Sequence, residues 1–150
     1  MARNVSLTIL GVRPHGKTIH HVNPRTGGYH LDYETIWYLQ ELRVRILDIL
    51  KQRYNFPQEF KPIHRPFRMG VLFFVKGRTP FDFTNLVKAV EDACNGLIYE
   101  DDSLRKGTLL PDGIVEHANA DAIVIRIEEM DAPLRLPVEQ FTTAEVEASA

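Results

Sequence analysis

The sequence from Phe67 to Asp102, FRMGVLFFVKGRTPFDFTNLVKAVEDACNGLIYEDD, indicates how this chain is organised. Its first ten residues form an apolar run of the kind found in buried strands. From about Thr84 to Asn95, apolar residues recur at helical spacing, and Gly96 stands where a glycine commonly ends a helix. The stretch therefore predicts a strand and then a short amphipathic helix, followed by an acidic turn.

Flanking segments extend this pattern in both directions. Residues 4–12 alternate well enough to form a first strand, and Asp32 is a suitable N-cap for a long helix over residues 33–53. Residues 122–129, AIVIRIEE, predict a strand with three isoleucines on one face, and residues 113–117 predict another strand. The order predicts an α+β fold with a small mixed sheet and two main helices.

The length and composition fit one soluble domain. The chain has 150 residues, of which 44% are apolar and 25% charged. It contains no apolar run of the roughly 18 residues that a membrane span requires, and its single cysteine, Cys94, suits a reducing cytoplasm. We expect a cytoplasmic domain over residues 1–130, a flexible tail over residues 131–150 and no membrane association.

Charge is distributed unevenly along the chain. The net charge of -2 combines a basic first half, with 13 basic and 5 acidic residues up to position 80, with a second half that has 5 basic and 15 acidic residues. Such asymmetry is typical of a basic surface for a polyanion beside an acidic cluster. Mutual neutralisation of the two halves through surface pairs is the more ordinary explanation on charge alone.

Chemistry-bearing side chains concentrate around the short helix. One arc of its helical wheel is polar, and aspartates stand before and after the helix. Mg²⁺ prefers carboxylate ligands with water and phosphate oxygens, and phosphodiester hydrolysis also needs a cation near the phosphate. Asp82, Asp101 and Asp102 are the candidate metal ligands, and Lys88 is the candidate cation.

These residues also have ordinary structural explanations. Asp82 is well placed to cap the helix, and Asp101 and Asp102 suit a solvated turn. Lys88 and Asp92 are spaced to form an i,i+4 ion pair. Both interpretations stay open on spacing alone.

The segment from Asp82 to Lys88, DFTNLVK, together with Asp92 and the later pair Asp101-Asp102, resembles the RusA family of Holliday-junction resolvases. The dense part of the match covers about 25 residues, and a weaker similarity covers the chain up to about residue 130. The resemblance implies a homodimeric endonuclease of bacteria or phages, cytoplasmic, that uses Mg²⁺ or Mn²⁺ to cut four-way DNA junctions in recombination, repair or phage DNA processing.

The resemblance also implies a role for each matching residue. Asp82 and Asp102 match metal ligands, and Asp101 is the neighbour of the second ligand. Lys88 matches a catalytic lysine that stabilises the phosphate in the transition state. Asn85 and Asp92 match supporting positions on the same helix face.

Thr84 departs from the family pattern, which has a second aspartate at this position. The change removes a negative charge from the expected metal site. Two alternatives therefore stand beside the nuclease: a junction-binding module of the same fold that does not cut, and a metal-dependent phosphohydrolase acting on nucleotides.

Basic residues before the motif are the candidates for DNA contact. A long polar loop over residues 13–30 includes Lys17 and Arg25, and its Gly27-Gly28 pair suits a hairpin turn. Lys76 and Arg78 approach Asp82 in sequence. Contacts between these four cations and DNA phosphates would give salt-sensitive affinity without sequence preference.

Trp37 and Val44 lie off the main apolar stripe of the long helix, as part of a broadened core face or as an interface with another subunit.

Overall fold

The computed structural model describes residues 2–22, 25 and 29–131. In chain order, the elements are β1 (Asn4–Leu10), β2 (Ile19–Val22), β3 (Tyr29–Leu31), α1 (Tyr33–Tyr54), β4 (Phe67–Phe74), α2 (Phe83–Cys94), the 3-10 helix η1 (Asp102–Leu104), β5 (Arg105–Thr108), β6 (Gly113–Val115) and β7 (Ala122–Glu129). The predicted α+β fold with a mixed sheet and two main helices is confirmed.

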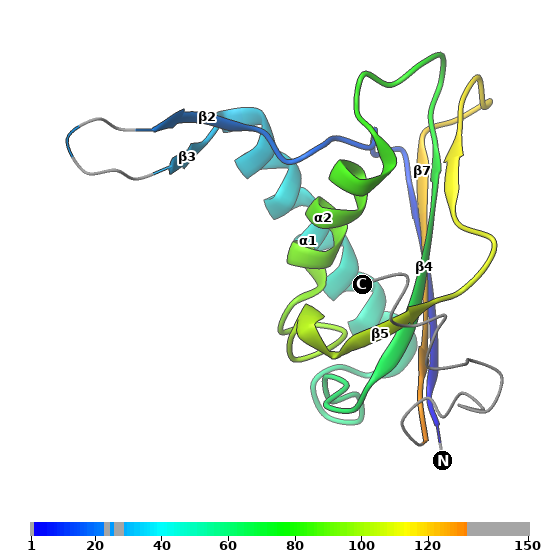
Figure 1. The fold of residues 1–150 in the computed structure, drawn as a ribbon. Helices are drawn as coiled ribbons and strands as arrows, with labels where there is room; N and C mark the ends of the chain where they lie inside the picture. Colours follow the sequence, from blue (N-terminus) through cyan, green and yellow to red (C-terminus); the bar gives the residue numbers. More distant parts are fainter. Residues whose placement is uncertain (1, 23–24, 26–28, 132–150) are drawn as a thin grey trace, which may run out of the picture.

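The main sheet has five strands, with β7 and β4 at its centre. β7 runs antiparallel to β1 on one side and to β4 on the other. β5 and β6 both pair in parallel with β4, one along its first half and the other along its second. Both helices lie on the same face of this sheet and next to each other (Figure 1). The molecule therefore has two layers.

The core lies between the sheet and the helices. Strand positions alternate between buried and exposed, so that Leu7 on β1, Phe73 on β4 and Ile125 on β7 all point into the helical layer. α1 contributes a buried stripe that includes Leu42 and Ile46. These apolar patterns explain why period-two and period-3.6 spacing in the sequence located the main elements correctly.

Gly70 explains how β5 and β6 come to share the edge of β4. A side chain at this position would collide with the carbonyl oxygen of Leu109, in the segment between β5 and β6. The backbone of Leu109 also donates a hydrogen bond to the Met69 carbonyl at 3.2 Å. A glycine therefore lets the chain pass close to β4 between its two short edge strands.

The helix boundaries follow from their caps. Asp32 accepts a 2.7 Å hydrogen bond from the Thr35 amide at the start of α1, and Asn55 ends this helix in a left-handed conformation. Gly96, directly after the α2 cap residue Asn95, also has a positive φ of 77°. The predicted cap at Asp32 and the predicted glycine stop are both confirmed.

β2 and β3 form a separate antiparallel pair that projects from the helical layer (Figure 1). The predicted turn at Gly27-Gly28 and the predicted tail beyond Asp131 lie outside the described residues. None of the helices in the described part of the chain is long and apolar enough to cross a membrane.

Candidate functional site

The candidate site is built on the polar face of α2. The opposite face of this helix is buried against the core through Leu86, Val87, Ala89, Val90, Ala93 and Cys94. Burial of that face leaves a polar arc facing outward, as the helical wheel predicts. The side chains of this arc are Asn85, Lys88, Glu91, Asp92 and Asn95.

Asp82 is the N-cap of α2. Its Oδ1 accepts a 2.7 Å hydrogen bond from the Asn85 amide, and its side chain is exposed. The capping role predicted as an alternative is therefore present. Thr84 is exposed in the first turn, two residues from Asp82.

Lys17 holds the polar loop against α2. Its amide donates to Asn85 Oδ1 at 3.0 Å, and its ammonium pairs with Asp92 Oδ2 at 2.6 Å. Gly16 makes this approach possible, because a side chain there would collide with the Phe81 ring and lie 2.9 Å from Asn85 Nδ2. The loop is thus fixed to the polar arc, and the charge of Lys17 is largely offset by Asp92.

Lys88 is exposed and forms no hydrogen bond or ion pair with the described residues. The i,i+4 partner suggested by the sequence, Asp92, is instead taken by Lys17. The alternative that Lys88 serves to pair with Asp92 is therefore wrong. Its ammonium group is available to an anionic ligand.

Glu91 and Asp102 meet at the C-terminal end of α2. Glu91 is half-buried, and Arg105 donates to its Oε1 at 2.8 Å. Burial raises the pKa of Glu91, the positive charge of Arg105 opposes that shift, and the neighbouring carboxylate of Asp102 adds to it. Two carboxylates therefore lie close together next to one guanidinium group.

The turn before η1 carries the other predicted aspartate. Asp101 is exposed, and its Oδ2 accepts a 3.2 Å hydrogen bond from the Ser103 amide. Hydrogen bonds from the Ser103 side chain and amide hold the pKa of Asp101 below its usual value. Tyr99, which is fully buried, fixes the start of this turn to α2, because its hydroxyl donates a hydrogen bond to the Glu91 carbonyl at 2.8 Å.

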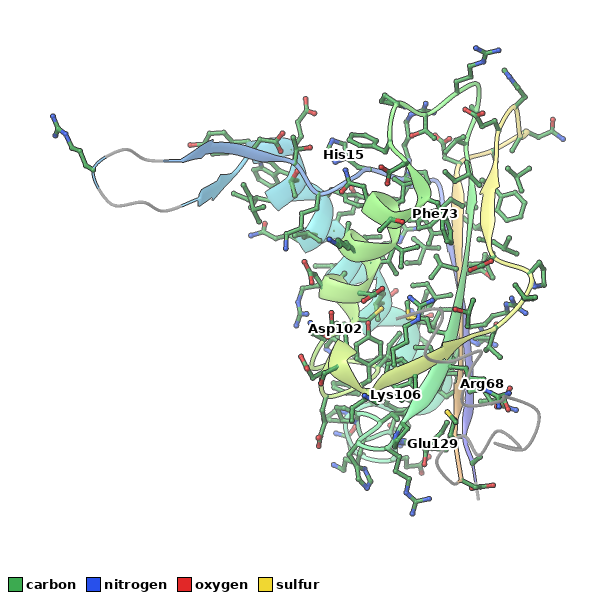
Figure 2. All side chains as sticks on the ribbon, viewed as in Figure 1. His15, Arg68, Phe73, Asp102, Lys106 and Glu129 are labelled. Carbon is green, nitrogen blue, oxygen red and sulfur yellow. The ribbon has the colours of Figure 1, made fainter. Side chains whose placement is uncertain are left out.

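The structure does not bring Asp82 and Asp102 together within one chain. Asp82 precedes α2, whereas Asp102 lies next to Glu91. Glu91 is nine residues after Asp82, which corresponds to about 13 Å along the helix axis. Figure 2 shows Asp102 at the end of α2 opposite to the loop over residues 75–82. Within the described ranges, no group of three or more His, Cys, Asp or Glu side chains is arranged to hold a metal ion.

The remaining predicted DNA contacts lie in the loop before α2 and on the β2–β3 hairpin. Lys76 and Arg78 are exposed in the loop that leads from β4 to α2. Arg13 shapes this loop by donating to the carbonyl groups of Lys76 at 2.9 Å and Arg78 at 2.7 Å. Arg25 is exposed between β2 and β3, on the projecting hairpin.

Cys94 is fully buried on the apolar face of α2, as the sequence predicts. Burial raises the pKa of its thiol to about 12. The thiol is therefore protonated at neutral pH and has no nucleophilic role there.

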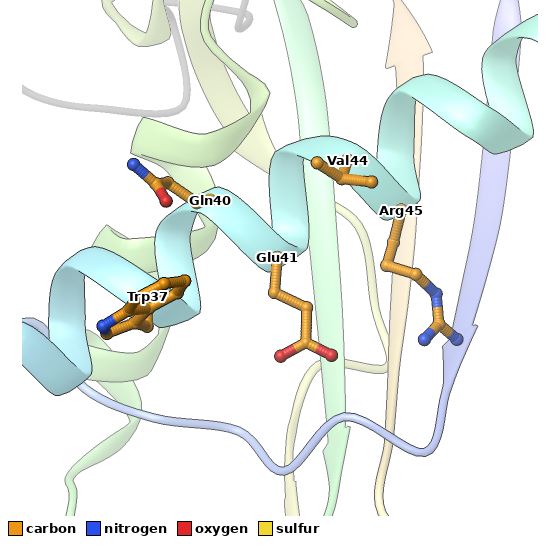
Figure 3. Close-up of a pocket in the computed structure, with 5 residues that line it drawn as sticks. All are labelled: Trp37, Gln40, Glu41, Val44 and Arg45. Atoms are coloured by element: carbon orange, nitrogen blue, oxygen red, sulfur yellow. The ribbon is translucent and has the colours of Figure 1, made fainter.

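α1 presents an exposed apolar surface away from the core. Trp37 and Val44 are 68% and 66% exposed, and with Gln40, Glu41 and Arg45 they line a shallow hollow of about 380 Å³ (Figure 3). The prediction that Trp37 and Val44 broaden the core face is wrong, because the core stripe of α1 turns these two positions outward. The alternative prediction of an interface stays open.

Sequence reasoning missed Glu91 and Arg105 as members of the site. Glu91 was visible on the polar arc, but its pairing depends on β5, a four-residue strand with too little apolar pattern to be recognised.

Comparison with protein-family models finds no match, and comparison with curated proteins finds no related protein.

Proposed function

We propose that this chain is a metal-dependent endodeoxyribonuclease that cuts four-way and other branched DNA junctions. The observation that carries the proposal is the position of Lys88. Its ammonium has no partner among the described residues and lies one helical turn from Glu91, on the face that also carries the motif residues. A free cation beside carboxylates is the combination that phosphodiester hydrolysis uses.

The carboxylates at the C-terminal end of α2 fit a divalent cation. Mg²⁺ is usually held by one or two carboxylates together with water and substrate phosphate oxygens. Asp102 and Glu91 supply two neighbouring carboxylates, and Asp101, which precedes Asp102 in the chain, is exposed. Mg²⁺ or Mn²⁺ bound there would act as a Lewis acid that offsets charge on the phosphate.

Each residue of the proposed site then has a defined role. Lys88 contacts the phosphate and stabilises the charge that develops on it as water attacks the phosphorus and the bond from phosphorus to one sugar oxygen breaks. Arg105 positions Glu91, and Lys17 fixes Asp92 and Asn85 so that the polar arc keeps its shape. Asp82 is the second acidic position, at the other end of the helix.

The proposed working unit is a homodimer in the cytoplasm of a bacterial or phage-infected cell. The exposed surface around Trp37 and Val44 is the candidate for the contact between two copies. Two copies would present two sets of α2 residues to the arms of one branched DNA. Lys76, Arg78 and Arg25 would contact the phosphates of those arms.

The test compares a labelled four-way junction with a linear duplex of the same sequence, in Mg²⁺, in Mn²⁺ and in EDTA. We expect paired cuts in the junction alone, and only with metal. Lys88→Gln should lower the cleavage rate about 10²- to 10³-fold, with an unchanged circular dichroism spectrum. Lys51→Gln, at an exposed position on α1, is the matched control and should cut normally.

Aspartate substitutions separate the two acidic positions. Asp102→Asn should abolish cutting while junction binding is kept. Asp82→Asn should do the same if Asp82 also holds metal, and unimpaired cutting by this variant would exclude that role. Thr84→Asp should raise the activity or lower the metal concentration required.

The position of Asp82 favours one alternative function. Because Thr84 is not acidic and Asp82 lies far from Asp102, the chain offers fewer clustered carboxylates than the family pattern implies. A junction-binding module that does not cut is therefore the second candidate. A shifted but uncut junction in both metals would support it, whereas nucleotide hydrolysis without junction cutting would indicate a phosphohydrolase.

A further inference from the structure

A basic hollow of about 250 Å³ lies at the end of the sheet where β1 begins and β7 ends. Its position is fixed by Glu129 on β7, which pairs with Phe67 at the start of β4 (Figure 2). β4 is eight residues long, about 26 Å, so the hollow is far from Lys76 and Arg78. The residues that line it are Arg3, Glu59, Lys61, His64, Arg65 and Glu129.

The floor of the hollow is formed by a buried carboxylate and the partly exposed arginine that pairs with it. Glu129 is 5% exposed, and its Oε2 accepts a 2.9 Å hydrogen bond from Arg3 Nε. Arg3 is fixed further by a 2.7 Å hydrogen bond to the Lys61 carbonyl and by its guanidinium group, 5.3 Å from the Phe60 ring centroid. Arg3 therefore satisfies Glu129 and stabilises the wall of the hollow.

The cations on the rim exceed what the carboxylates neutralise. Arg65 is half exposed and pairs with Glu129 Oε1 at 3.8 Å, so the exposed part of its guanidinium group can contact a second anion as well. Lys61 and His64 are also exposed; the Lys61 ammonium donates one hydrogen bond, to the Pro57 carbonyl at 2.6 Å, and keeps two further donors. Apart from His64, the lining has three cations against the two carboxylates Glu59 and Glu129, so one positive charge remains in excess and the rim attracts an anion.

The rim is joined directly to the acidic turn at the end of α2. Ile63 donates to the Ile98 carbonyl at 2.9 Å and accepts from the Glu100 amide at 2.9 Å. His64 and Arg65 follow Ile63, just as Asp101 follows Glu100. The basic rim and the candidate carboxylates are thus on neighbouring backbone segments.

We propose that this hollow binds a phosphodiester group of the DNA backbone, with Arg65 and Lys61 as the principal contacts and His64 beside them. The inference deepens the proposed function and rests on it. Of the cations identified from the sequence, Lys76 and Arg78 lie before α2 and Arg25 lies on the β2–β3 hairpin, while Lys88 contacts the phosphate that is cut. The hollow adds a contact beyond the Asp102 end, so the DNA arm is held on both sides of that phosphate.

The test measures junction binding in EDTA, where no cutting interferes. A fluorescent four-way junction is titrated with the wild-type chain and with the Lys61→Gln/Arg65→Gln double variant over a range of salt concentrations. The double variant keeps Arg3, so Glu129 stays paired and the fold is preserved. Lys51→Gln/Arg53→Gln, on the last turn of α1, makes the same charge change elsewhere as a control.

We expect the Lys61→Gln/Arg65→Gln variant to bind at least tenfold more weakly at 100 mM salt. The slope of log affinity against log salt should fall by about 0.9, which is the contribution of one neutralised phosphate. If the Lys61→Gln/Arg65→Gln variant has the same affinity and salt slope as the control variant, the inference is overturned. The proposed function still stands in that case, because the wild-type chain binds the junction. Failure of the wild-type chain to bind any junction overturns the proposed function itself.

A second arm identifies the source of the phosphate. Inorganic phosphate is titrated into the wild-type chain and the double variant by calorimetry. Weak or undetectable binding supports the assignment to DNA, where neighbouring phosphates act together. Micromolar binding of free phosphate that is lost in the double variant, with junction affinity unchanged, would overturn it in favour of a small-anion site.

Discussion

Replacing Arg105 by alanine should destabilise the protein through the carboxylate of Glu91. Arg105 joins β5 to α2 and β4 by donating to Glu91 Oε1 at 2.8 Å and to the Met69 carbonyl at 3.1 Å. Both partners of the ion pair have side chains that are 19% exposed. Truncation would therefore leave a half-buried carboxylate whose burial already raises its pKa.

The size of the loss lies between two known limits. Exposed ion pairs contribute about 0–1 kcal/mol, whereas removing one partner of a fully buried pair costs about 3–5 kcal/mol. At 19% exposure, and with a backbone hydrogen bond lost as well, we expect Arg105→Ala to lower the free energy of unfolding by about 2–3 kcal/mol. Glu91→Gln removes the charge but leaves a hydrogen-bonding group, so its cost should be below about 1 kcal/mol.

The assay is urea unfolding followed by far-ultraviolet circular dichroism, in EDTA so that bound metal does not contribute. Both single variants and the Arg105→Ala/Glu91→Gln double variant complete a thermodynamic cycle. We expect a coupling free energy of about 1–2 kcal/mol, because the arginine matters most when Glu91 is charged. Lys106→Ala, at the adjacent exposed position, is the control and should change stability by less than about 0.5 kcal/mol.

Additive effects of the two single variants would refute this account of the site. Such a result would mean that Arg105 acts through its contacts with the sheet and not through Glu91. A loss below about 1 kcal/mol for Arg105→Ala would show that solvent screens the pair as it screens surface pairs. Either outcome would remove Arg105 as the residue that positions Glu91.

Further predictions concern the thiol, the loop, the core and the α1 surface. Because burial raises the pKa of Cys94 to about 12, a thiol reagent should label it at pH 8.5 only after unfolding, and rapid labelling of the folded protein would contradict the burial. The free energy of unfolding should fall as pH rises above about 9, because the thiol of the unfolded chain ionises before that of the folded chain. Gly16→Ala should cost about 1–3 kcal/mol in urea unfolding, since the methyl group meets the Phe81 ring. Ile46→Ala should cost about 2–5 kcal/mol, measured in the same way, because Ile46 is fully buried. Trp37→Ser should weaken self-association in analytical ultracentrifugation with little change in stability, and an unchanged dimer would exclude this surface as the interface.

Much of the fold is local in origin and was therefore predictable. The strand over residues 122–129 and α1 carry apolar periodicity long enough to identify both, and Asp32 marks the start of the helix. β5 and β6 have four and three residues, respectively, and neither has a strong apolar pattern. They form because α2 returns the chain to the free edge of β4, where Gly70 leaves room, and that placement depends on tertiary structure.

The site was predictable only as a set of residues. Helical spacing correctly placed Lys88 and Asp92 on one face of α2. Their interactions depend on segments distant in sequence: Lys17, 75 residues away, takes Asp92, and Arg105 takes Glu91. Spacing along a helix identifies neighbours on that helix, but it cannot identify the partners that another loop or strand supplies.

The charge asymmetry of the chain has two physical consequences, and both follow from which pairs form. Two cations of the basic half, Lys17 and Arg3, each bind a carboxylate of the acidic half, Asp92 and Glu129 respectively, so neutralisation between the halves is real. Those same pairs leave other cations without a matching carboxylate, since each acid that is bound internally is no longer available to them. Lys88, four residues before Asp92 on α2, is one such cation, because Asp92 pairs with Lys17 and not with Lys88. The internal ion pairs therefore help to create the basic surface, and disrupting Lys17 should weaken phosphate binding by returning Lys88 to Asp92.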